Sequence, residues 1–108
     1  MDNTYPYQVG DHVLLLEDIF GGHRPQRRVI AQCCGGRSSR FLIHPNAPGL
    51  VPSWVERGQI VPYTEFADLA LSELADNIEM EVVSRGGRFP SENSVQHRVD
   101  EVVDYLFD

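Results

Sequence analysis

The sequence predicts an α+β fold in which five short strands are followed by two amphipathic C-terminal helices. Up to Tyr63, short apolar runs alternate with Gly and Pro turns, and no helical period persists. After Pro62, apolar residues recur at helical spacing. The 108 residues, 42% hydrophobic and 23% charged, fit one globular unit with a single core, composed of a β half at 1–63 and a helical extension at 64–108 packed on it.

The β half alternates as half-buried strands do. The strands are expected at 9–16, 28–34, 39–44, 54–56 and 59–63. In the second strand Val29, Ala31 and Cys33 share one face, and in the third Phe41 and Ile43 share one face.

The helical extension contains clear start and stop signals. Thr64 and Ser91 are the expected N-caps of the two helices, and the run from Arg85 to Arg88 contains two glycines that separate them. The first helix is predicted to bury one stripe of Phe66, Ala67, Ala70, Leu71, Leu74 and Ile78. The second is predicted to bury Val95, Val99, Val102, Val103 and Leu106. Because Val is a mediocre helix former, this second helix requires tertiary packing.

The β half resembles a small SH3-like barrel, a fold type that includes Tudor, KOW and integrase C-terminal modules. The resemblance covers residues 5–63 and rests on the opening Gly10-Asp11-His12-Val13-Leu14-Leu15 and on Trp54-Val55-Glu56 followed by Ile60-Val61-Pro62-Tyr63. Such modules mostly bind proteins, peptides or nucleic acids, so the resemblance implies a binding role without naming the ligand.

A second stretch is similar to the opening of MazF-like toxins, which are endoribonucleases built on a related barrel. It comprises Gly10-Asp11-His12-Val13 and Gly22-His23-Arg24-Pro25. In that family the Arg before the Pro assists RNA cleavage, so the resemblance implies this role for Arg24. The Thr or Ser that the family has after its third strand has no counterpart near His44.

Catalytic, cofactor and metal signatures are missing from the sequence. It contains no Cys-x-x-Cys or His-x-x-x-His spacing and no Gly-x-Ser-x-Gly turn. Cys33 and Cys34 are adjacent in a strand and point to opposite faces, so they cannot easily pair, and we expect Cys33 to be buried and Cys34 partly exposed. We therefore expect a non-enzymatic protein without cofactor or metal.

Charge is distributed unevenly along the chain. The net charge is −7 and all nine basic residues are arginines. Residues 1–63 carry six arginines against five acidic residues, whereas residues 64–108 carry three against eleven. The start lacks the features of a signal peptide, and no apolar run approaches the roughly 18 residues of a membrane span, so we expect a cytoplasmic protein with no membrane contact.

Five arginines are predicted on neighbouring loops and strand starts of the β half. They are Arg24, Arg27, Arg28, Arg37 and Arg40. Together they could contact the phosphates of a nucleic acid. The alternative is that they face the acidic helices within the chain, and the overall negative charge favours this alternative.

The acidic helices indicate a more specific surface. On the first helix, Leu69 projects away from the core stripe, near four acidic residues: Glu65, Asp68, Glu73 and Asp76. On the second helix, acidic side chains lie opposite the Val stripe: Asp100, Glu101 and Asp104. An exposed Leu ringed by carboxylates is typical of a partner-binding face, although acidic helix faces also serve solubility alone.

These features predict a small binding or regulatory protein whose partner is a protein with a basic surface. The contact residues would be the acidic helix residues other than Glu73, together with Leu69, and Trp54 on the β half. Such a chain suits a phage or mobile-element inhibitor that occupies a nucleic-acid-binding site on its target. The alternatives are a nucleic-acid-binding module that uses the arginine loops, and a MazF-like ribonuclease.

Overall fold

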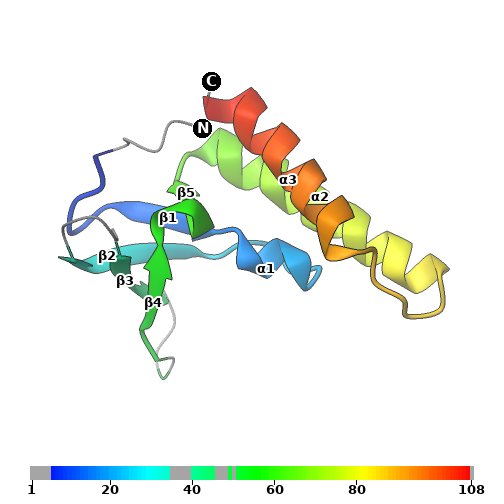
Figure 1. Ribbon diagram of the computed structural model, residues 1–108, viewed down its shortest axis with the longest axis horizontal. Coiled ribbons are helices and arrows are strands. Elements are labelled where there is room, and N and C mark those ends of the chain that lie inside the picture. Colours follow the sequence, from blue (N-terminus) through cyan, green and yellow to red (C-terminus); the bar gives the residue numbers. More distant parts are fainter. Residues whose placement is uncertain (1–5, 35–39, 46–48, 50, 108) are drawn as a thin grey trace.

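The predicted α+β class is confirmed: a five-stranded antiparallel sheet is followed by two C-terminal helices (Figure 1). The computed structural model describes residues 6–34, 40–45, 49 and 51–107. The elements are β1 (His12–Leu15), α1 (Glu17–Phe20), β2 (Arg27–Cys34), β3 (Arg40–Pro45), β4 (Ser53–Glu56), the 3₁₀ turn η1 (Arg57–Gln59), β5 (Ile60–Pro62), α2 (Glu65–Ser84) and α3 (Glu92–Phe107).

The sheet has the order β4-β3-β2-β1-β5, and all four neighbouring pairs are antiparallel. β1 therefore lies between β2 and β5, with Leu14 opposite Val61. The register of β2 and β3 shifts between Ile30 and Gln32. This irregularity changes which residues of β2 share a face.

Two predictions for Cys33 in β2 are wrong, and the register shift explains the first of them. Cys33 lies opposite the buried Phe41, so it shares the face of Ile30 rather than that of Val29 and Ala31. The predicted burial of Cys33 is also wrong, because Cys33 and Cys34 occupy the end of β2 and both are exposed. The Cys33 thiol lies 3.9 Å from the carbonyl oxygen of Tyr7.

Buried side chains form two clusters, not the single core that the sequence predicts. One lies within the β half and consists of Tyr7, Val13, Leu15, Ile30, Phe41, Ile43, Val55 and Ile60. The other joins the sheet to the helices and consists of Leu14, Leu16, Ile19, Val61, Ala67, Leu71, Ala75, Ile78, Val95, Val99 and Val103. Successive residues of β1 enter different clusters because side chains alternate across a strand.

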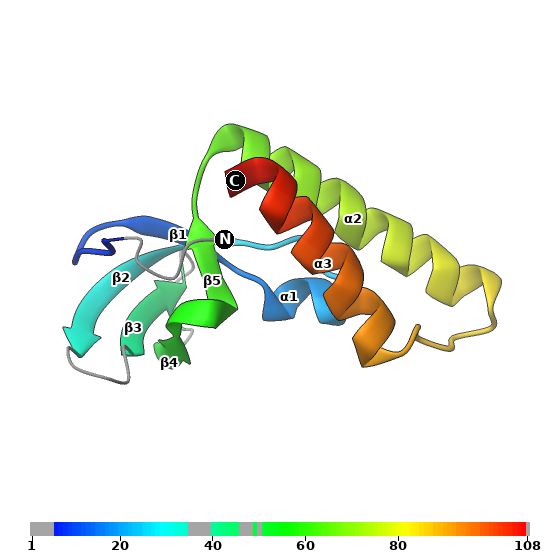
Figure 2. The ribbon, with the colours of Figure 1, turned by 45° about the horizontal axis from the view of Figure 1, so that its top comes forward.

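The short helix α1 was not predicted, because four residues are too few to display a helical period. It buries Ile19 in the helical cluster and packs against α2 and α3 (Figure 2). The chain then turns at Gly22, whose φ is +74°. A Cβ at this glycine would lie 3.8 Å from the Cα of Glu79, so the turn passes close to α2.

The predicted caps of the two long helices are confirmed. The Thr64 hydroxyl accepts a hydrogen bond from the Ala67 amide at 2.9 Å, and the Ser91 hydroxyl accepts one from the Ser94 amide at 3.3 Å. The connecting turn contains Gly86 and Gly87, both at positive φ. This is the left-handed conformation that commonly ends a helix.

Phe66 does not belong to the buried stripe of α2, contrary to the prediction, because its side chain is 63% exposed. The fully buried positions of α2 are Ala67, Leu71, Ala75 and Ile78. They recur every three or four residues and form a narrow stripe. Phe66 precedes the first of them and is rotated about 100° away around the helix.

We expect Leu14→Ala to lower the free energy of unfolding by about 2–5 kcal/mol, because it leaves a cavity in the cluster that joins β1 to the helices. Urea denaturation of the purified protein measures this difference. Leu69→Ala is the matched control, since Leu69 is exposed, and it should change the free energy of unfolding by less than about 0.5 kcal/mol. Equal effects of the two substitutions would contradict the assignment of this core.

Candidate functional site

A groove runs between α2 and α3. The two helices lie side by side in both views (Figures 1 and 2). The groove has a volume of about 310 Å³ and is formed by the middle of α2 and the second half of α3. It is lined by Ala70, Glu73, Leu74, Asn77, Glu101, Val102 and Tyr105.

The groove combines an apolar base with carboxylates on both helices. Leu74 and Val102 are half-buried and pack on the helical cluster. Glu73 of α2 and Glu101 of α3 are exposed beside them, and no arginine or histidine is among the described lining residues. Tyr105 is 78% exposed. The groove is therefore suited to a ligand that is apolar along its centre and cationic at its sides.

Large apolar side chains continue along the solvent side of α2. Phe66, Leu69, Met80 and Val83 are all at least 63% exposed. Their spacing of three, eleven and three residues places them within about one third of the helix circumference. The predicted exposure of Leu69 is confirmed. Phe66 and Leu69 form one exposed apolar pair and Met80 and Val83 another, with Glu73 and Asp76 between them on the same side of α2. Exposed apolar residues grouped in this way are typical of a protein-binding face.

The predicted acidic residues of α2 have different surroundings. Glu65 is exposed in the first turn, and half-buried Asp68 accepts a hydrogen bond from the Ser72 hydroxyl at 3.4 Å. Asp76 accepts two hydrogen bonds from the Arg24 guanidinium, at 3.0 and 2.6 Å. These bonds hold the pKa of the Asp76 carboxyl below its usual value. Asp76 is thus engaged within the chain.

The predicted acidic residues of α3 are all exposed. Asp100 accepts a hydrogen bond from the Gln96 side-chain amide at 2.8 Å. Glu101 lies 3.1 Å from His97 one turn earlier and lines the groove. Asp104 is in the last turn of the helix. Of the seven predicted helix residues, the groove itself therefore includes only Glu101, and Leu69 lies immediately beside the groove residue Ala70.

Three arginines of the predicted basic patch are engaged within the chain. Arg24 holds Asp76, and the Arg28 guanidinium donates to Asp18 at 2.7 and 3.3 Å. The Arg27 guanidinium lies 4.9 Å from the centre of the Tyr63 ring, in cation–π geometry. Arg40 is exposed on β3, opposite Glu56 of β4. Arg37 lies outside the described residues.

Trp54 is 52% exposed on β4. It lines a hollow of about 350 Å³ together with Arg40, Val55, Glu56 and Gln59. The Arg57 side chain, which the sequence does not single out, lies over the rings of Tyr7 and Phe41 at 5.3 and 5.4 Å from their centres.

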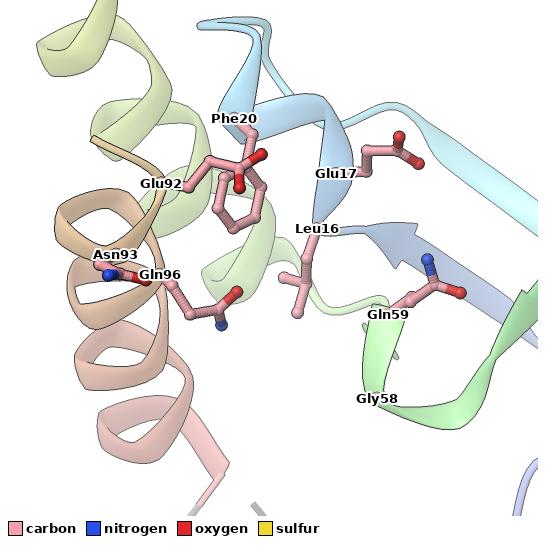
Figure 3. Close-up of a pocket in the computed structure, with 8 residues that line it drawn as sticks. All are labelled: Leu16, Glu17, Phe20, Gly58, Gln59, Glu92, Asn93 and Gln96. Atoms are coloured by element: carbon pink, nitrogen blue, oxygen red, sulfur yellow. The ribbon is translucent and has the colours of Figure 1, made fainter. Parts of the chain in front are cut away.

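A third cavity lies between the start of α3, α1 and η1 (Figure 3). Its volume is about 440 Å³, and it is lined by Leu16, Glu17, Phe20, Gly58, Gln59, Glu92, Asn93 and Gln96. The figure shows the Phe20 ring and the Leu16 side chain between the two walls. Its polar lining consists of amides and carboxylates. Arg24, the residue singled out by the toxin resemblance, lines none of these three cavities.

An ion pair joins the C-terminal half of α2 to the N-terminal half of α3. The Arg98 guanidinium donates to both carboxylate oxygens of Glu81, and Arg85 lies 3.5 Å from the same carboxylate. The hydrogen bonds from Arg98 lower the pKa of the Glu81 carboxyl. The negative charge of Glu81 is therefore offset by two arginines.

Tyr105 and the groove itself were not predicted from the sequence. Tyr105 lies four residues after Glu101, so it projects from the same side of α3. That spacing was the available signal. The groove requires knowledge of how α2 and α3 dock, which the separate patterns of the two helices do not contain.

Comparisons with protein-family models, with curated proteins and with solved structures find no match for this chain. Among the described residues, none of the helices combines the length and the apolar character that crossing a bilayer requires. The same residues contain no group of three or more His, Cys, Asp or Glu side chains arranged to hold a metal ion.

We expect the stabilisation from the pair Glu81–Arg98 to depend on pH. Because the pKa of Glu81 in the folded protein lies below its ordinary value of 4.5, this contribution is fully present above that pH and is lost as the pH falls through the folded-state pKa. Arg98→Gln should therefore destabilise the protein at pH 7 and have a smaller effect near pH 3. Urea denaturation at both pH values checks this, and a difference that is independent of pH would contradict it.

Proposed function

We propose that this protein is a non-enzymatic binding protein that docks the outer face of α2 and α3 onto a basic surface of another protein. The observation that carries the proposal is the groove between these helices. It has apolar side chains at its base, carboxylates of Glu73 and Glu101 beside them, and the exposed Leu69 and Tyr105 next to it. Exposed Leu and Tyr side chains supply contact area, and the carboxylates select a cationic partner.

The partner chemistry that fits best is a nucleic-acid-binding protein. The basic surface of such a protein binds the phosphates of nucleic acid, and carboxylates along a helix can occupy the positions of those phosphates. By occupying that surface, the protein would act as an inhibitor or regulator, a role suited to a small protein of a phage or mobile element. The pairing of Arg24 with Asp76 and of Arg28 with Asp18 supports this partner over direct binding of nucleic acid by the arginine loops.

The β half is proposed to be an SH3-like module that supports the helix pair. Its consecutive strands follow the order β5-β1-β2-β3-β4, and the 3₁₀ turn η1 links β4 to β5. Trp54 gives this half its own exposed aromatic contact. We propose that it contacts the same partner beside the main surface.

We expect Glu101→Arg to weaken capture of the partner by about tenfold, because it replaces an attractive charge beside the groove with a repulsive one. The measurement is a pull-down from a cell extract with the tagged protein, in which proteins and nucleic acids eluted by a salt gradient are both identified. The identified partner is then measured with the purified protein and its variants.

Glu79→Arg is the matched control, because it makes the same change of charge at an exposed position of α2 that does not line the groove. It should retain most of the binding. Equal losses in both variants would mean that only net charge matters, and would contradict the proposed surface. Recovery of RNA or DNA without protein would do so as well.

A further inference from the structure

We propose that the groove between α2 and α3 receives an amphipathic helix of the partner, with an apolar stripe flanked by arginine or lysine. This inference rests on the proposed function and adds the structural class of the ligand. The bound segment would pack as a third helix on the pair. The groove offers ridges of helical side chains on both walls, which is the surface that a helix fits.

The spacing of the wall residues matches a helical ligand. On α2 the groove is lined at positions 70, 73, 74 and 77, and on α3 at positions 101, 102 and 105. These positions span about two turns, or about 10 Å. The two exposed apolar pairs, Phe66 with Leu69 and Met80 with Val83, lie on either side of this region and together span about 26 Å along α2. A partner helix of about five turns would cover that length.

An extended peptide is less suited to this surface. Peptides that bind as strands gain affinity from backbone hydrogen bonds to a sheet edge. The backbone groups in the interior of α2 and α3 are already paired within each helix, so they offer no such bonds. A helical ligand satisfies its own backbone and contributes only side chains to the contact.

A second copy of this chain would not fit the groove. Each copy carries a net charge of −7, and the described lining residues include no arginine to meet the carboxylates of another copy. Two such faces repel each other. The complementary partner is basic on both sides of its apolar stripe, because Glu73 and Glu101 contribute from different helices.

The distribution of charge also indicates which part of the partner helix lies over which part of α2. At the C-terminal half of α2, Glu81 is bound by Arg98 and lies near Arg85, whereas Met80 and Val83 remain exposed. In the groove, Glu101 lies 3.1 Å from His97, and the described lining residues include no arginine to meet Glu73 or Glu101. The basic residues of the partner helix are therefore expected beside Glu73 and Glu101, and its more apolar end over Met80 and Val83.

The test uses the full chain labelled with ¹⁵N and a synthetic peptide of about 18 residues, long enough for five turns. The probe contains Leu at helical spacing, flanked by Arg, with the remaining positions Ala. A second peptide has the same composition in an order that forms no stripe. We expect the first peptide to gain helicity on binding, to shift the amide signals of Ala70, Val102 and Tyr105, and to bind at least about tenfold more tightly than the second.

Tyr105→Ala should weaken binding of the helical peptide by about fivefold or more without changing net charge. Phe89→Ala is the matched control, because Phe89 is exposed in the turn between the helices and does not line the groove, and it should leave affinity unchanged. Equal affinity of the two peptides, no effect of Tyr105→Ala, or shifts confined to the cavity of Figure 3 would each overturn the inference.

The same titrations separate this inference from the proposed function. If both peptides bind equally but both lose affinity with Glu101→Arg and not with Glu79→Arg, the acidic docking face stands and the helical ligand is wrong. If neither peptide depends on Glu101 and no basic protein is captured, the proposed function itself fails.

Discussion

The structure depends on a strand, β1, that is buried on both faces. Val13 and Leu15 enter the cluster within the β half, while Leu14 enters the cluster beneath the helices. A run of apolar residues does not by itself select which face meets which cluster, because both faces are apolar. The pairing with β2 on one side and β5 on the other fixes that choice. The position of the helix pair on the sheet follows from it.

Much of this fold could be predicted because its signals are local. Alternation in β3, the caps at Thr64 and Ser91, and the glycine break after α2 each depend on a few neighbouring residues. The bulge in β2 and the four-residue helix α1 could not be predicted, since their stability comes from tertiary contacts. Phe66 was misplaced because a helical wheel shows which side is apolar but not how wide the buried stripe is.

The negative charge of the candidate surface and the exposure of Leu69 could be predicted from the sequence, but the shape of the groove could not. Asp76 looked equivalent to its acidic neighbours in the sequence, yet a loop 52 residues away supplies Arg24 as its partner. The pair of Glu81 with Arg98 likewise depends on how the two helices dock. These two ion pairs engage Asp76 and Glu81 within the chain, whereas the described residues of the groove include no arginine to meet Glu73.

The two strands at the ends of the sheet order, β4 and β5, are only four and three residues long. β5 ends at Pro62, which has no amide hydrogen to donate to a neighbouring strand, and β4 ends at the charged Glu56. Short ends with these residues offer a poor template for strands of other molecules. These short ends therefore disfavour edge-to-edge aggregation of the sheet.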